Sequence, residues 1–212
     1  MEKSSSVRYF KIFKTLEKYF FKKYFVWFLI FYIGINALVI LLEFLGHIDL
    51  FLKDFSKFYE AYKKYLYLTF PIIIYFSIYF FFSEIKQSKE YIVVQSLGIN
   101  FFQVLKIIFL FLFFIVVFIY IQSNIYNYDI NKIILLISFS ILSAMNGLLI
   151  GEEKDFSGMI LGFVIIFSFF NIFSSLSNFH IIDTKVLLIL MIILILTNFI
   201  VFVKIYKKKG YI

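Results

Sequence analysis

Residues 24–42 read YFVWFLIFYIGINALVILL and contain no charged side chain. A helix that crosses a bilayer needs roughly 17–25 residues of this kind. Five further uncharged stretches follow: Tyr65 to Ser83, Ile107 to about Ile121, Ile133 to Gly151, Phe156 to Ile182 and Val186 to Val203. We therefore predict an all-α integral membrane protein with six transmembrane helices, forming one domain over residues 1–212.

The overall composition agrees with a membrane environment. Hydrophobic residues make up 63% of the chain and charged residues 16%, whereas about a quarter of the residues in soluble domains are charged. The first 23 residues carry seven basic residues and no long apolar core, so we expect no cleavable signal. Because the chain has no cysteine, disulfides, thiolate metal sites and cysteine nucleophiles are excluded.

The distribution of basic residues predicts the topology. With six spans, both termini and the segment from Ser83 to Lys106 share one side, which holds fifteen of the 21 Lys and Arg residues. By the positive-inside rule this side, including the basic N-terminus at residues 1–23, is cytoplasmic. The net charge of +8 therefore indicates contact with lipid headgroups rather than nucleic acid. The C-terminal anchor consists of Lys204, Lys207, Lys208 and Lys209.

The segment from Glu43 to Lys64 has a helical pattern on the outer side. Its apolar residues at 48, 51, 52, 55, 58 and 59 recur at steps of three and four, which predicts an amphipathic helix in the interface. This helix either packs on the bundle or contacts substrate. The candidate lipid-headgroup contacts are Lys53, Lys57, Lys63 and Lys64.

Small residues and one proline indicate how the spans pack. Two small-xxx-small pairs, Gly147/Gly151 and Gly158/Gly162, would let the fourth and fifth helices approach each other or a partner closely. Pro71 lies inside the second span, where we expect it to kink the helix.

No catalytic, cofactor or metal site emerges from the sequence. His47 and His180 are far apart and lack metal-ligand spacing, and no phosphate-binding glycine loop with its lysine is present. A membrane-embedded enzyme would need acid–base groups inside the spans, and these are nearly absent. We therefore expect a protein that is not an enzyme.

The segment between the second and third spans carries the most informative motif. Residues 84–98 read EIKQSKEYIVVQSLG, a short helix with a Ser/Glu start and a stop at Gly98. Lys86 and Glu90 are four residues apart, which predicts an exposed ion pair.

This pattern resembles the LptF/LptG permeases of the lipopolysaccharide-export ABC transporter. Those permeases carry Phe-Pro in the second span and a Ser-x-Glu helix ending in Gly in the following loop. This chain has Phe70-Pro71, then Ser88-Lys-Glu90 and Gln95-Ser-Leu-Gly98, in the same order and at matching spacing. The resemblance covers the first three spans well and the last three loosely.

The resemblance implies a permease in the inner membrane that pairs with a second LptF/LptG-like permease, as a heterodimer or a homodimer. It also implies that residues 84–98 form a coupling helix that docks on a cytoplasmic ABC ATPase dimer, which hydrolyses the ATP. Spans one and five would form the walls of a lateral gate for a lipid cargo, lipopolysaccharide or a related lipid. The coupling residues would be Glu84, Ser88, Glu90, Gln95 and Gly98.

One departure from the family is large. Its members insert a periplasmic β-jellyroll between spans three and four, where this chain has only Gln122 to Lys132. Two alternatives to lipopolysaccharide export therefore stand: a non-transporting scaffold or assembly subunit, and a permease for another lipidated cargo such as a lipoprotein.

Overall fold

The structure is a computed structural model in which almost all of the described residues are helical. It describes residues 2–59, 69–90, 92, 96, 106, 109–110, 112–117, 120–121, 130–153, 157–165, 167–168 and 184–208. The main helices are α1 (Glu2–Gly46), α2 (Ile48–Lys53), α4 (Phe70–Gln87), α7 (Ile130–Glu153) and α9 (Thr184–Lys208). The predicted all-α class is confirmed.

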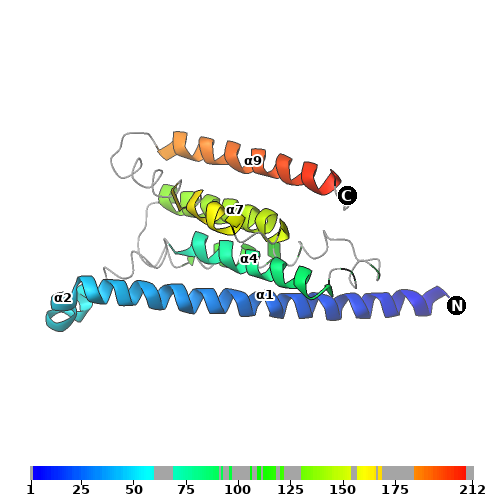
Figure 1. The fold of residues 1–212 in the computed structure, drawn as a ribbon, viewed down its shortest axis with the longest axis horizontal. Coiled ribbons are helices and arrows are strands. Elements are labelled where there is room, and N and C mark those ends of the chain that lie inside the picture. Colours follow the sequence, from blue (N-terminus) through cyan, green and yellow to red (C-terminus); the bar gives the residue numbers. More distant parts are fainter. Residues whose placement is uncertain are drawn as a thin grey trace.

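The four long helices lie side by side in the order α1, α4, α7 and α9 (Figure 1). The N-terminal end of α1, the end of α4 and the C-terminal end of α9 all point to the same end of this stack. This arrangement agrees with the predicted placement of both termini and the segment after α4 on one side of the membrane. That this side is cytoplasmic stays a prediction from the charge count.

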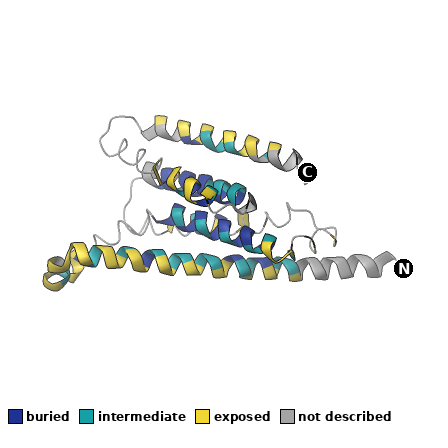
Figure 2. Ribbon diagram, viewed as in Figure 1, coloured by how far each residue is buried: buried dark blue, intermediate teal, exposed yellow. Residues whose placement is uncertain are grey.

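Helix α4 lies at the centre of the bundle. Its buried residues run from Phe70 at its start to Ile85 near its end and cover most of the helix surface, and Figure 2 shows this buried surface between α1 and α7. Phe81 of α4 meets Phe20 and Tyr24 of α1 edge to face. On the other side, Phe139 of α7 is fully buried in the same core. Aromatic packing therefore holds α4 in the interior.

Exposed residues recur along the coloured part of α1 and predominate on the coloured part of α9 (Figure 2). In the apolar part of α1, exposed side chains include Ile30, Ile33, Leu38 and Leu41. At 1.5 Å per residue, the 45 residues of α1 extend about 67 Å, well beyond the hydrocarbon core of about 30 Å. Helix α1 therefore offers an apolar surface to lipid or to a partner.

The described helices coincide with the predicted spans. Thr15–Gly46 and Ile133–Ile150 are long and apolar enough to cross a membrane, and Ile189–Val201 is a shorter apolar stretch. Helix α4 covers the second span from Phe70 onward, and short described parts of the third and fifth spans are also helical. That all six segments cross the membrane remains a prediction.

The expected kink at Pro71 is wrong. Pro71 lies in the first turn of α4, directly after Thr69 and Phe70. The backbone N–H of a residue in that turn has no partner within the helix, so proline is tolerated there without bending the helix. Pro71 therefore marks the start of α4 rather than a bend within it.

The single amphipathic helix predicted for residues 43–64 is also wrong. Helix α1 continues through Gly46, and His47 is not helical. Helix α2 follows, and the non-helical Asp54 separates it from a helical turn at residues 55–59. The Asp54 carboxylate accepts a hydrogen bond from the Lys57 backbone N–H at 3.3 Å and starts that turn. Phe51 packs edge to face against Phe44, Phe55 and Phe58, so aromatic contacts stabilise the folded-back segment.

Two glycines permit close helix packing, as predicted, but they approach a different partner as well. A Cβ on Gly147 of α7 would lie 2.6 Å from the carbonyl oxygen of Tyr75 in α4. A Cβ on Gly162 would collide with the Ile150 side chain of α7 and lie 2.5 Å from the Tyr75 hydroxyl. That hydroxyl donates a 2.9 Å hydrogen bond to the Met159 carbonyl. The two glycines therefore allow the fourth and fifth segments to pack closely against α4.

Candidate functional site

A cluster of charged side chains joins α1 to the end of α4 and the residues beyond it. The Lys23 ammonium donates to the Glu90 carboxylate at 2.8 and 3.0 Å, and it lies 3.1 Å from Glu84. The Lys23 side chain is 12% exposed, whereas Glu84 and Glu90 are 41% and 27% exposed. The lysine is thus enclosed while both carboxylates remain accessible from outside.

Two aromatic residues of α1 complete this cluster. The Trp27 indole Nε1–H donates a 2.5 Å hydrogen bond to Glu84, and the Tyr19 hydroxyl donates to Glu90 at 3.1 Å. The Trp27 ring stacks on Phe80 of α4, which holds the indole in place. Tyr19, Lys23 and Trp27 follow one another at steps of four residues and therefore share a face of α1.

The environment of Glu90 favours its ionised form. Partial burial raises the pKa of the Glu90 carboxyl, but hydrogen bonds from Lys23, Ser88 and Tyr19 outweigh this effect and place the pKa below its ordinary value. Glu90 is therefore a carboxylate at neutral pH, and its remaining lone pairs can accept hydrogen bonds from a cationic partner.

The chain turns sharply between the two acidic residues. Helix α4 continues through Glu84 to Gln87, and the Ser88 N–H and hydroxyl both donate to the Glu84 carbonyl at 2.9 Å. Lys89 then adopts a left-handed conformation with φ of 57°, which ends the helix. Glu90 and Ile92 follow in helical conformation.

The predicted coupling helix at residues 84–98 therefore has a different start. Glu84 belongs to the last turn of α4, and the helical turn that carries Glu90 begins after Lys89. The break also means that Lys86 and Glu90 are not four residues apart on one continuous helix. Among the predicted coupling residues, the structure brings Glu84, Ser88 and Glu90 together. Gln95 and Gly98 lie outside the described residues.

Sequence reasoning missed Lys23, Tyr19 and Trp27. In the sequence, Lys23 is one of seven basic residues before the first span, and it directly precedes the apolar stretch at Tyr24. The spacing of Tyr19, Lys23 and Trp27 is a detectable signal, because it places three polar hydrogen-bond donors on one face at the end of a span. The sequence does not indicate the register of α1 against α4, which places this face next to Glu84 and Glu90.

The described candidate headgroup lysines, Lys53 and Lys57, lie beyond the C-terminal end of α1, far from this cluster. Lys53 ends α2, and Lys57 pairs with Asp54 at 3.2 Å while remaining 73% exposed. Lys63 and Lys64 lie outside the described residues. Near the same end, the buried Asn36 donates to the Tyr32 carbonyl at 2.7 Å and is contacted by the Thr69 hydroxyl at 3.5 Å. This contact fixes the start of α4 against α1.

Within the described part of the chain, no group of three or more His, Asp or Glu side chains is placed to hold a metal ion. The cluster pairs two carboxylates with one ammonium group and offers no nucleophile paired with a base. Its chemistry suits binding of a positively charged partner group.

Comparison with protein families gives a match that contains this whole cluster. The model of the lipopolysaccharide export system permease LptF/LptG matches residues 18–132, just over half of the chain. The chain belongs to the LptF/LptG family. Comparison with curated proteins and with solved structures gave no significant match.

Membership of the LptF/LptG family has direct consequences. The chain is a multi-pass protein of the inner membrane and a permease component of the lipopolysaccharide-export type. Its apolar helices agree with that environment. Lys23, Glu84 and Glu90 all lie within the part of the chain that matches the family.

Proposed function

We propose that this chain is a permease subunit of an ABC transporter that exports lipopolysaccharide or a related lipid. In this proposal the Glu84 and Glu90 carboxylates form the docking point for a cytoplasmic ABC ATPase dimer, and a second LptF/LptG-like permease completes the membrane part. Family membership supports transport, and the accessible carboxylates at the end of α4 support docking.

The charge of the cluster is the observation that carries the docking proposal. Lys23 contributes one positive charge, and Glu84 and Glu90 together contribute two negative charges. These three groups therefore leave one negative charge without a counterpart among themselves. An Arg or Lys of the ATPase would supply that counterpart, and such charge pairs at interfaces favour correct orientation and fast association.

The exposed surface of α1 supports a lipid as cargo. Its apolar stretch, residues 24–42, has no ionisable carboxylate or amine to bind an ion or a hydrophilic solute. Ile33 and Leu38 are 63% and 59% exposed there, and an acyl chain can pack on such side chains. We place α1 at the lateral gate, with the fifth segment as the opposing wall.

A photoreactive residue on α1 tests transport. The probe belongs at the exposed Ile33, and the same probe at the buried Asn36 is the inward-facing control. With the ATPase present, ATP should change the yield of lipid adducts at Ile33 and leave the yield at Asn36 unaltered. Adducts with ordinary bilayer lipid that do not respond to ATP would instead favour the scaffold function.

The identity of the captured lipid separates the cargo alternatives. Mass spectrometry of the Ile33 adduct should reveal a glycolipid if the chain exports lipopolysaccharide or a relative. An adduct with an acylated polypeptide would instead identify a lipoprotein as the cargo.

A further inference from the structure

The position of Glu90 is set by side chains from another helix. The left-handed turn at Lys89 separates Glu90 from α4, so the direction of α4 does not by itself determine where the carboxylate lies. Lys23 of α1 donates to both oxygens of this carboxylate. The same ammonium contacts Glu84 in the last turn of α4. One side chain therefore joins three parts of the chain.

We propose that Lys23 is the positioning residue of Glu90: it holds the carboxylate in place for docking and links the segment after α4 to α1. The proposal rests on the docking function suggested above for Glu90. A pull on this segment by a bound ATPase would be transmitted to α1 through the Lys23–Glu90 contact. Helix α1 would then respond to events at the docking point.

The chemistry of lysine allows Lys23 to release Glu90 and remain paired with Glu84. An ammonium group has three donors, and Lys23 divides them between two carboxylates. If a cation of the ATPase draws Glu90 away, Glu84 still neutralises Lys23. The Trp27 indole holds Glu84 in position for this role. Lys23 therefore avoids the cost of an unpaired, largely buried charge.

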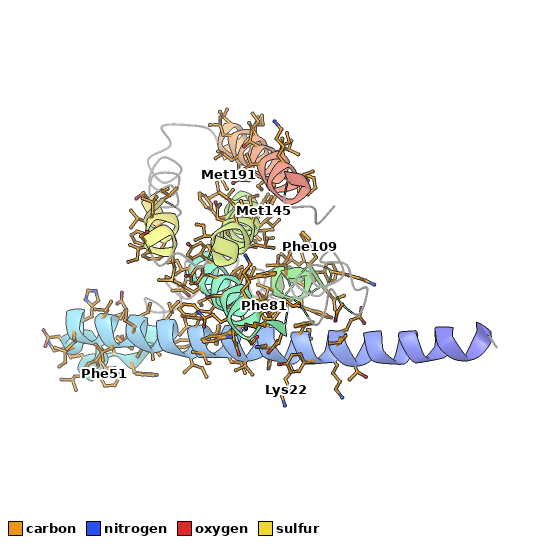
Figure 3. The ribbon with its side chains drawn as sticks, turned by 45° about the vertical axis from the view of Figure 1, so that its right-hand side comes forward. Lys22, Phe51, Phe81, Phe109, Met145 and Met191 are labelled. Atoms are coloured by element: carbon orange, nitrogen blue, oxygen red, sulfur yellow. The ribbon has the colours of Figure 1, made fainter. Side chains whose placement is uncertain are left out.

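The neighbouring Lys22 provides a matched control. It is exposed, and its side chain points away from the bundle (Figure 3). Lys22→Ala removes the same charge from the same turn of α1 without touching the cluster. Lys23→Arg keeps a cation that can bind both carboxylates, whereas Lys23→Ala removes the link.

The test measures distances between spin labels in the full chain, reconstituted in lipid nanodiscs without the ATPase. Because the chain has no cysteine, introduced cysteines give specific labelling. Labels at the exposed Lys18 and Ile92 report on the segment after α4. Labels at Lys18 and Gln87, also exposed, report on the α1–α4 distance as an internal reference.

We expect Lys23→Ala to broaden the 18–92 distance distribution and to leave the 18–87 distribution narrow. Lys23→Arg should restore the narrow 18–92 distribution, and Lys22→Ala should have no effect. Lys23→Ala should also weaken retention of the ATPase about fivefold or more, the size expected for coupling between contacting residues.

Two outcomes separate this inference from the docking proposal. If Lys23→Ala leaves the 18–92 distribution as narrow as in the wild type, the positioning role is wrong, whatever Glu90 does. If the distribution broadens but Glu90→Ala retains the ATPase fully, the link by Lys23 stands and the docking proposal fails.

Discussion

Gly147 of α7 faces the Tyr75 carbonyl of α4 so closely that a Cβ would lie 2.6 Å from the oxygen. The obstacle is backbone, so an added methyl group has to push the two helices apart. We expect Gly147→Ala to lower stability by about 1–3 kcal/mol, the usual cost of overpacking. Thermal unfolding in detergent checks this.

Gly34 is the control for that substitution. It lies on the exposed side of α1, and nothing lies within 4 Å of its added Cβ. Gly34→Ala should be neutral or slightly stabilising, since alanine favours helix by up to about 1 kcal/mol over glycine. Equal destabilisation by both substitutions would mean that the α4–α7 contact at Gly147 is not close.

Trp27 gives an optical signal of the cluster, because it is the only tryptophan in the chain. Its indole N–H donates to Glu84, and a nearby carboxylate stabilises the positive charge that the pyrrole ring gains on excitation. We therefore expect Glu84→Gln to shift the emission of Trp27 to shorter wavelength. Glu43→Gln, at the other end of α1, should leave the spectrum unchanged. Identical spectra for wild type and Glu84→Gln would contradict the contact.

The contact between Lys23 and Glu90 should depend on pH with a defined sign. The pKa of Glu90 is lowered from 4.5 in the folded chain, so the ionised contact is fully present above the ordinary value. It weakens only as the pH falls through the lower, folded value. Measured in a Glu84→Gln background, the 18–92 spin-label distribution should stay narrow at pH 5 and broaden only below pH 4.5.

A broadening that is complete above pH 4.5 would show that Glu90 is not stabilised as a carboxylate. Glu90→Gln in the same background serves as the control. Its distribution should already be broad at neutral pH and should not change on acidification.

The topology can be tested with single cysteines at Ser5, Ser88 and Asn127. The charge count places the first two positions in the cytoplasm and the third outside. An impermeant thiol reagent added to right-side-out vesicles should label only the chain with cysteine at position 127. Labelling at position 5 or 88 from outside would reverse the assigned orientation.

The helices were predictable from the sequence because hydropathy is a local property. Uncharged runs such as residues 24–42 and 133–151 lie entirely within α1 and α7. The ends of helices depend on single backbone conformations that hydropathy does not record. The left-handed Lys89 and the non-helical residues His47 and Asp54 interrupt segments whose apolar period continues. The helix predicted for 43–64 is therefore interrupted, and the one predicted for 84–98 begins after Lys89.

The sequence predicted the acidic residues of the site but not their partner on α1. The family pattern drew attention to Glu90, but its partner Lys23 is 67 residues away. Their contact depends on the antiparallel packing of α1 against α4 and on the register set by pairs such as Tyr24 with Phe81. A single sequence does not reveal that register. The start of α4 at Phe70 lies inside an uncharged run, so hydropathy did not place Pro71 in the first turn of a helix.

The docking claim is tested most directly by co-purification of the ATPase with the Glu90→Ala chain. Loss of one partner from an interfacial charge pair costs about 2–5 kcal/mol, so retention of the ATPase should fall by roughly 30-fold or more. Glu17→Gln, on α1 near the same end, should retain the wild-type amount. Recovery of the ATPase with Glu90→Ala at the wild-type level, from a chain that remains inserted and folded, would contradict the account.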